Sequence, residues 1–354
     1  MPADDQLPSA SIANLKQRAK LVSATRVYFE SAGYWEVETP ILSQEMVLDS
    51  WIDPFVVLDG TEQGSAETRY FLQTSPEAHM KRLLAAGSGP IFQFSQVFRK
   101  GEIGPRHNPE FMMLEWYKPL DELPDQIQLV ENFVRSFFAE AARLRILATN
   151  RSGEPLSRPT HGKLLPSAPF ERLTYNAAFE RYLGLSALEA PTSELVRKAG
   201  TLDIAPPVLD PDDRDGWLNF LLGAAIEPML GLERPVFLMD YPASQAALAT
   251  TRALYPAGPE VANRFELYID GVELCNGYHE LTDPVELAHR AAIQTRLREA
   301  AGLPALKPPQ RLMAAMSRDF PPCTGVALGF DRLVMLALGA NQISEVISFE
   351  WDRA

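Results

Sequence analysis

The sequence predicts an α+β fold, in which antiparallel hairpins are combined with helices. Alternating apolar residues at 92–98 lead into a Gly-punctuated loop, and a second alternating run returns at 111–117. Asp270-Gly271 separates two further apolar runs, which is a strong hairpin-turn signal. Apolar residues recur at three- and four-residue steps over 11–32 and 120–147, as on one face of a helix. Hairpins and helices in separate stretches of one chain are typical of the α+β class.

The composition is that of a soluble globular protein. The chain has 354 residues, 46% of them hydrophobic, enough to bury a large core within a single domain. No apolar run is long enough to cross a bilayer, and the acidic N-terminus is unlike a signal peptide. Cys275 and Cys323 lie in unrelated segments without the spacing of metal ligands. We therefore expect a cytoplasmic protein with reduced cysteines and no zinc.

The net charge weighs against extensive contact with nucleic acid. The chain carries 33 basic and 46 acidic residues, and 33 − 46 gives −13. Proteins that bind RNA normally present a basic face, because phosphate neutralisation supplies most of their affinity. A local basic patch can be hidden in such a sum, so the charge argues only against a large tRNA-binding surface.

The N-terminal region predicts a long helix followed by a short strand. The helical repeat over 11–32 is followed by Gly33, which suits a helix C-terminus. An alternating segment at 35–39 then reaches Pro40, which has no N–H to continue a strand ladder. Taken alone, this pattern also fits a plain core helix and its following strand.

Two further stretches predict helices, and the stretch between them predicts a loop. Ser75-Pro76-Glu77 predicts the start of a helix, because serine caps, proline fits the first turn and glutamate complements the helix dipole. Residues 148–169 lose all periodicity and are rich in Ser, Gly, Pro and Thr, which predicts a surface loop or insertion. Residues 174–232 predict three short helices.

The loop between the first two strands is rich in charge. Arg99, Glu102, Arg106 and His107 lie at its tip, where a nucleoside triphosphate could bind. Arginine suits phosphate because its planar fork donates two parallel hydrogen bonds and keeps its charge. An isolated loop of this kind is more often a solvated hairpin. The neighbouring segments decide against that interpretation.

The C-terminal region predicts a glycine-rich strand that leads directly into a helix. Residues 325–329 form the strand, and the helix continues through Arg332 to Gly339. A glycine followed by an arginine at a helix start is a weak signal by itself. Its place after the two preceding patterns makes it informative.

In this order, the three patterns resemble motifs 1, 2 and 3 of the class II aminoacyl-tRNA synthetases. Four segments are similar to the lysyl subgroup and to its short paralogues, the ligases that attach β-lysine to elongation factor P: TSPE at 74–77, HNPEF at 107–111, ELCNGYHELTD at 273–283 and GVALGFDRLVMLALG at 325–339. The resemblance implies the class II catalytic fold, an antiparallel sheet flanked by helices, as one domain over residues 1–354. It also implies a homodimer formed through the motif 1 segment. Only about a dozen residues precede the first helix, so we expect no anticodon-binding domain.

The resemblance implies an ATP site with a magnesium ion. Its residues are Arg99, Gly101, Glu102, His107, Asn108, Phe111, Glu273, Leu274, Gly329 and Arg332. The two catalytic arginines, Arg99 and Arg332, would hold the α- and γ-phosphates, and His107 would touch the β- and γ-oxygens together with Arg106. Phe111 would stack on adenine with Asn108 nearby, and Glu273 would bind Mg²⁺, which prefers oxygen ligands.

The resemblance also implies a site for lysine or (R)-β-lysine. Its residues are Ser75, Glu77, Tyr117, Asn276, Glu280 and Ala327. Carboxylates such as Glu77 and Glu280 suit ammonium groups, although a lone glutamate is usually exposed and Tyr117 could simply be a core aromatic.

Two departures from the lysyl pattern affect this site. The glutamate that usually stands two places after the motif 2 arginine is found at Glu102, three places after Arg99, so its partner is open. Ala327 replaces a glycine of the lysyl-tRNA synthetases, as in the ligase paralogues, and its methyl group would crowd the α-carbon position of the amino acid.

These features predict an enzyme that activates an amino acid with ATP as an acyl-adenylate. The leading hypothesis is transfer of (R)-β-lysine or lysine to a lysine side chain of elongation factor P, without stable tRNA binding and without a membrane. A truncated enzyme that charges tRNA through its acceptor stem is the second hypothesis. A non-catalytic regulatory paralogue is the third, and the retention of Arg99, Glu273 and Arg332 speaks against it.

Overall fold

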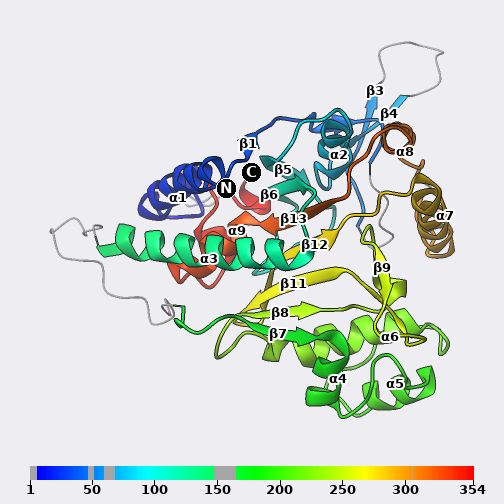
Figure 1. Ribbon diagram of the computed structural model, residues 1–354. Coiled ribbons are helices and arrows are strands. Elements are labelled where there is room, and N and C mark those ends of the chain that lie inside the picture. Colours follow the sequence, from blue (N-terminus) through cyan, green and yellow to red (C-terminus); the bar gives the residue numbers. More distant parts are fainter. Residues whose placement is uncertain (1–5, 47–51, 60–67, 147–164, 305) are drawn as a thin grey trace. The chain divides into compact units, whose positions relative to one another are not determined.

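The computed structural model describes residues 6–46, 52–59, 68–146, 165–304 and 306–354. The chain divides into two compact units: unit 1 comprises Met1–Asp121, Leu129–Leu164 and Thr282–Ala354, and unit 2 comprises Glu122–Gln128 and Leu165–Leu281. Both combine helices with strands that are mostly antiparallel, which confirms the α+β class (Figure 1). Most of the predicted loop at 148–169 lies outside the described residues.

The main sheet of unit 1 has the strand order β1-β5-β6-β13. These strands are β1 (Trp35–Glu36), β5 (Ile91–Phe98), β6 (Glu110–Pro119) and β13 (Cys323–Gly329). β1 is parallel to β5, whereas β5, β6 and β13 form antiparallel pairs, so the predicted first hairpin is confirmed. Helix α9 (Phe330–Leu338) follows β13 directly and ends at Gly339, whose φ of 70° is left-handed.

The alternation of side chains gives this sheet an apolar and a polar face. Phe92 and Trp116 lie on the apolar face, where they pack with Phe29 of α1 (Ile12–Ser31) and Phe133 of α3 (Leu123–Ile146). The ring centroids of Phe29 and Trp116 are 4.9 Å apart. Since one face is covered by helices in this way (Figure 1), the other is left to carry polar side chains.

Helix α1 begins and ends as predicted, but two of its four buried residues are polar. Ser11 caps it by accepting a hydrogen bond from the backbone N–H of Asn14. The buried residues are Gln17, Leu21, Thr25 and Phe29. Ile12 and Val27 are exposed, because the apolar residues of this helix are spread around its axis.

Unit 1 also contains helix α2 (Glu77–Ala85), two further helices and a small sheet. This helix packs against α8 (Gln310–Met316), which in turn contacts α7 (Pro284–Ala300). A small sheet has the order β2-β4-β3, with β2 at Leu42–Ser43, β4 at Thr68–Leu72 and β3 at Val56–Asp59.

Unit 2 is built on strands in the order β12-β11-β8-β7. They are β7 (Glu171–Thr174), β8 (Val236–Met239), β11 (Arg264–Ile269) and β12 (Val272–His279). Asp270 and Gly271 join β11 to β12 with φ angles of 51° and 66°, which both need the left-handed region, as in a type I′ turn. A short hairpin is made of β9 (Thr251–Ala253) and β10 (Glu260–Ala262).

The three short helices predicted for unit 2 are confirmed. They are α4 (Tyr175–Leu183), α5 (Thr192–Ala199) and α6 (Arg214–Leu221). Their apolar residues form one core with Val236 and Leu238 of β8. Among the described residues of the whole chain, no helix is both long and apolar enough to span a membrane.

Candidate active site

The charged loop between β5 and β6 meets the first turn of α9. Arg332 donates from Nε to the carbonyl oxygen of Arg106 over 3.2 Å, and its Nη2 lies 2.5 Å from Nε2 of His107. An arginine can only donate, so Nε2 of His107 must be the unprotonated nitrogen. The structure therefore brings together groups that the sequence placed in the second and third motifs.

Burial and the neighbouring arginines keep His107 in its neutral form. Desolvation, followed by the positive charges of Arg332, Arg99 and Arg106, lowers its pKa from 6.5 to about 4. At neutral pH the cluster thus contains three guanidinium groups and a neutral imidazole. Such a set concentrates positive charge and hydrogen-bond donors that phosphate oxygens could accept from.

Arg99 directly follows β5. Its Nε is buried and, among the described residues, has no hydrogen-bond partner. Its Nη1 is 3.7 Å from a carboxylate oxygen of Glu102, and its guanidinium lies over the ring of Phe111 at 5.2 Å. Gly101 next to it has a φ of 83°, which allows the chain to turn between Arg99 and Glu102.

Asn108 has a structural task that the sequence did not indicate. Its Nδ2 donates to the carbonyl oxygen of Glu110 over 2.6 Å, and its Oδ1 accepts from the backbone N–H of Trp351 over 2.9 Å. The residue therefore ties the loop to the C-terminal segment of the chain. Phe111, predicted to stack on adenine, lies beside Arg99.

Glu115 lies at the centre of the polar face of unit 1, and sequence reasoning did not select it. It is fully buried, with 0% exposure. Its carboxylate accepts from the hydroxyl of Ser75 over 2.6 Å and from the hydroxyl of Tyr117 over 3.0 Å. The signal was available in the alternation along β6, because a glutamate two residues before Tyr117 must share its face.

Ala327 lies beside this carboxylate. It pairs with Glu115 in the register of β13 and β6, and Tyr117 pairs with Gly325. Residues paired across an antiparallel sheet have Cβ atoms about 5 Å apart. The methyl group of Ala327 is therefore a direct neighbour of the buried carboxylate, and Gly329 follows on the same face.

Glu77 occupies the first turn of α2, but it is already paired. Nζ of Lys81 donates to its Oε1 at 2.5 Å, and the side chain of Lys81 is only 2% exposed. Ser75 accepts a hydrogen bond from the N–H of Glu77, but it is not the predicted N-cap, because α2 begins at Glu77 and Pro76 occupies the N-cap position. The negative charge of Glu77 is thus offset by a lysine of the same helix.

A buried ion pair fixes the start of α9. Arg18 of α1 donates to Oδ1 of Asp331, and Oδ2 of Asp331 accepts from the backbone N–H of Met112 over 2.8 Å. The side chains of Arg18 and Asp331 are 18% and 2% exposed. Asp331 precedes Arg332, so this contact joins all three motif segments next to the phosphate-binding candidate.

The remaining predicted residues lie in unit 2, on or just after β12. Leu274 is buried, Glu273 is partly buried, and Glu280 is 1% exposed although an exposed carboxylate was the alternative. Asn276 donates to the hydroxyl of Tyr278 over 3.0 Å. Its buried Oδ1 has no hydrogen-bond partner among the described residues, so it keeps an acceptor available.

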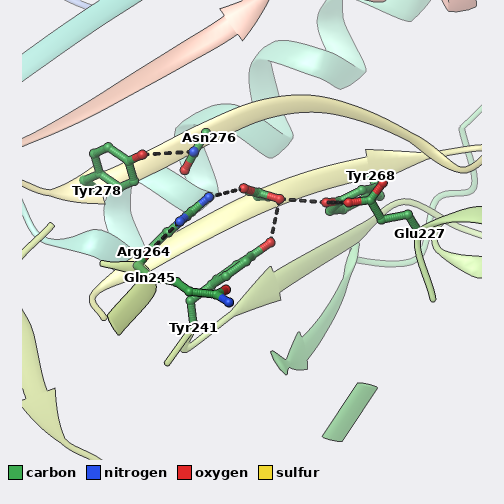
Figure 2. A network of polar contacts seen from close by, with 8 residues as sticks. Glu227, Tyr241, Gln245, Arg264, Tyr268, Asn276 and Tyr278 are labelled. Atoms are coloured by element: carbon green, nitrogen blue, oxygen red, sulfur yellow. Dashed lines mark hydrogen bonds and ion pairs between the residues drawn. The ribbon is translucent and has the colours of Figure 1, made fainter. Parts of the chain in front are cut away.

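A polar network behind β12 was also missed from the sequence (Figure 2). The carboxylate of Glu266, which pairs with Asn276 in register, accepts from Arg264, Tyr241 and Tyr268 at 2.5, 2.5 and 2.7 Å. Burial raises the pKa of both tyrosines, so they remain neutral donors. Glu266, Tyr241 and Tyr268 are buried and Arg264 is partly buried, so this network links β11 and β8 beside the strand that carries Asn276.

Comparison with known proteins places this arrangement in a family. The family model described as tRNA synthetases class II (D, K and N) matches residues 7–353. The chain belongs to this class II family. The resemblance inferred from the three motifs is thereby confirmed.

Several curated relatives of this class II chain share one name, elongation factor P–(R)-β-lysine ligase. The protein of Proteus mirabilis (strain HI4320) is 42% identical over 353 residues, which cover 99% of this chain and 98% of that relative. The proteins of Haemophilus influenzae (strain PittGG) and Pasteurella multocida (strain Pm70) are each 41% identical over 347 residues, with 98% of both chains covered.

Proposed function

We propose that the protein is an AMP-forming ligase that activates (R)-β-lysine with ATP and transfers it to a lysine side chain of elongation factor P. The name shared by relatives about 41% identical over 98% of the chain supports the overall reaction. A ligase that modifies a translation factor would work in the cytoplasm. The assignment of individual residues is supported by the geometry of each unit.

In the first step, a carboxylate oxygen of the amino acid attacks the α-phosphorus of ATP, and pyrophosphate leaves as the acyl-adenylate forms. Such phosphoryl transfer depends on positioning and charge neutralisation more than on acid–base chemistry. Within the described part of the chain Nε of Arg99 has no hydrogen-bond partner, and Arg332 presents its guanidinium beside neutral His107. Together they stabilise the negative charge on the phosphates. Gly101, Glu102, Leu274 and Gly329 complete the proposed ATP site.

Glu273 is the residue that we assign to magnesium. Among the described residues, no three His, Cys, Asp or Glu side chains gather as a ready-made metal cage. In nucleotide sites magnesium takes one or two carboxylates together with phosphate oxygens, so a single partly buried glutamate fits. When bound, the ion would neutralise charge on the phosphate oxygens.

The polar face of unit 1 supports the choice of a substrate with two ammonium groups. Glu115 supplies a buried carboxylate that Ser75 and Tyr117 orient, whereas the charge of Glu77 is offset by Lys81. We assign Glu115 to one ammonium of the amino acid, together with the predicted Ser75, Glu77 and Tyr117. Asn276 and Glu280, both buried acceptors on unit 2, are assigned to the same substrate.

In the second step, the neutral amine of the acceptor lysine attacks the acyl carbonyl. An amide bond forms, AMP leaves, and the amine gives up a proton to solvent. The net charge of −13 argues for a protein acceptor over tRNA. Charging of tRNA through the acceptor stem is the competing outcome.

The observation that carries this proposal is the buried Glu115, oriented by Ser75 and Tyr117 on the unit 1 sheet that also leads to the arginine cluster. The test is to incubate the protein with ATP, each lysine isomer and either elongation factor P or tRNA, and to follow the mass of each acceptor. We expect a mass gain on the factor with (R)-β-lysine. Robust tRNA charging with no gain on the factor would reverse the assignment.

A second experiment, on amino-acid activation alone, tests the catalytic arginines. Arg99→Ala and Arg332→Ala should abolish amino-acid-dependent ATP–pyrophosphate exchange while circular dichroism stays unchanged. A non-catalytic paralogue would show no exchange in the wild type. Near-normal exchange in both well-folded variants would instead refute the site.

A further inference from the structure

Gln93 of β5 lies beside Glu115 and is not among the residues of the proposed site. The two residues pair in the register of β5 and β6, and Glu115 pairs on its other side with Ala327 of β13. Gln93, Glu115 and Ala327 therefore form one row across the sheet, with their side chains on the same face. Gln93 is only 3% exposed. A polar side chain buried this deeply needs hydrogen-bond partners.

The amide of Gln93 has a partner at one end. Its Nε2 donates to Oγ of Ser95 over 3.3 Å. Its Oε1 is buried and has no hydrogen-bond partner in the described ranges of the chain. If the oxygen and nitrogen of the amide changed places, the hydroxyl of Ser95 would donate to the oxygen, and the nitrogen would lack an acceptor among the same residues. In either orientation a ligand or a water molecule must complete the hydrogen bonds of this amide.

A second buried glutamine shares these surroundings but not the place beside Glu115. Gln73 is also 3% exposed, and its Nε2 donates to the same Oγ of Ser95 over 2.5 Å and to the carbonyl oxygen of Gln96 over 2.9 Å. Its Oε1 is likewise buried without a hydrogen-bond partner in the part of the chain that the structure describes. Gln73 directly follows β4 and does not belong to the row that contains Glu115.

A carboxylate beside an amide oxygen suits an ammonium group. An ammonium has three N–H donors and no acceptor, so a carboxylate alone leaves part of its donors to other partners. Residues paired across an antiparallel sheet have Cβ atoms about 5 Å apart. A single nitrogen can therefore lie within hydrogen-bond distance of both Glu115 and Gln93.

We infer that Gln93 determines substrate specificity, because its Oε1 accepts a hydrogen bond from the same substrate ammonium that Glu115 binds. This inference rests on the proposed function, since it takes a diamino acid as the substrate. Ser95 is a positioning residue, because its hydroxyl holds the amide of Gln93. Glu115 then has an acceptor as its neighbour on β5 and the methyl group of Ala327 as its neighbour on β13. The row thus attracts an ammonium on one side and limits its space on the other.

The first test measures activation of the amino acid, which needs no acceptor. Gln93→Met keeps the approximate length of the side chain and removes the amide oxygen. In β-lysine-dependent ATP–pyrophosphate exchange, we expect the KM for β-lysine to rise roughly tenfold, with the KM for ATP and the kcat within twofold of the wild type. Gln93→Asn withdraws the amide by one methylene group and should raise the same KM, which provides a second variant if Gln93→Met folds poorly.

Gln73→Met is the matched control, because it removes an equally buried amide that also contacts Ser95. The KM for β-lysine should stay within twofold of the wild type in this variant. An equal rise in both methionine variants would show that the buried polar layer supports the site only as a whole, and it would overturn the inference. A lowered melting temperature of Gln93→Met with an unchanged KM would assign Oε1 to a structural water and overturn it as well.

Two analogues with one ammonium each test whether Gln93 and Glu115 share a ligand. β-Aminohexanoate keeps only the β-ammonium of β-lysine, and ε-aminohexanoate keeps only the terminal one. Both are added as competitive inhibitors of exchange. Gln93→Met and Glu115→Gln should raise the inhibition constant of the same analogue and leave that of the other within twofold. Sensitivity to different analogues in the two variants, or to both analogues in Gln93→Met, would refute the shared ammonium.

Failure of the inference can be told apart from failure of the proposed function. If the wild type shows no exchange with any lysine isomer, the proposed function fails and this inference falls with it. Normal exchange in the wild type, with an unaltered KM for β-lysine in Gln93→Met and Gln93→Asn, would remove only Gln93 from the site.

Discussion

At the scale of single residues, the most informative feature is a buried carboxylate with two hydroxyl donors. A buried carboxylate at 0% exposure is costly unless its oxygens are satisfied, and the hydroxyls of Ser75 and Tyr117 donate one hydrogen bond to each of them. In the proposed function this oriented carboxylate binds an ammonium group of the substrate.

The first prediction concerns this charge. Glu115→Gln keeps the shape of the side chain and removes its charge, so the KM for β-lysine in ATP–pyrophosphate exchange should rise roughly 10- to 100-fold, since a charged hydrogen bond contributes about 1.5–3 kcal/mol. The Kd for ATP should stay the same. A KM within twofold of the wild type would remove Glu115 from the amino-acid site.

The second prediction concerns the neighbour of Glu115 in register. The methyl group of Ala327 should crowd an α-ammonium and favour the β-amino isomer, because an added methyl group in a packed site costs about 1–3 kcal/mol. We expect (R)-β-lysine to be activated better than α-lysine, and Ala327→Gly to narrow the gap in kcat/KM. Equal efficiencies for both isomers, unaltered by the substitution, would show that another residue sets the choice.

The third prediction concerns His107 and pH. Its pKa of about 4 is below the ordinary 6.5, so the unfolded chain binds this proton more readily than the folded one. The stability contributed by the neutral ring is complete above pH 6.5 and is lost as the pH falls towards 4. In an NMR titration we expect no inflection of His107 between pH 5.5 and 8, and Arg332→Ala should move the pKa upwards by removing a nearby positive charge. An inflection near 6.5 in the wild type would contradict the neutral cluster.

At the scale of elements, the beginning of α9 is held by parts of the chain that are far apart in sequence. Asp331 contacts Arg18 of α1 and the backbone of β6, and it precedes Arg332. Asp331 is buried and Arg18 is partly buried, and both charges are paired only when α1, β6 and α9 are all in place, so the pair contributes mainly by fixing geometry. Asp331 is therefore a positioning residue for Arg332.

The fourth prediction tests this positioning. Asp331→Asn leaves the Arg18 charge without its partner and should lower the free energy of unfolding by about 3–5 kcal/mol. It should also raise the KM for ATP more than the KM for β-lysine, because Arg332 loses its support. The double variant Arg18→Met/Asp331→Asn should recover part of the stability. Purely additive losses in this double-mutant cycle would show that the pair does not act as a unit.

At the scale of the whole molecule, the surface of the motif 1 segment suggests assembly. Ile12, Val27 and Trp35 are 57%, 65% and 50% exposed, although they are large and apolar. Single exposed apolar residues are ordinary, but these three belong to the segment that forms the dimer interface in the class II resemblance.

The fifth prediction is a homodimer formed through α1 and β1. Sedimentation equilibrium should give twice the chain mass of 39.3 kDa at micromolar concentration. Val27→Glu should weaken the dimer, because it places a charge in the expected apolar interface, whereas Val208→Glu, the same substitution at an exposed valine of unit 2, should leave the dimer unchanged. A concentration-independent monomer mass would refute the assembly.

The sequence by itself determined the α+β class, the family, the main hairpins and the order of the three motifs. These features depend on local physics, namely alternation along strands, periodicity along helices and turn chemistry at Asp270-Gly271. They can therefore be recognised without knowing how the elements pack. Only the tertiary structure decided which polar groups meet. Lys81 offsets Glu77, Ser75 and Tyr117 orient Glu115, and Arg18 holds Asp331 across an interval of 313 residues. These pairs depend on which faces of the elements pack together. A buried charge needs hydrogen-bond partners, and the fold supplies them from residues that are near or far along the chain.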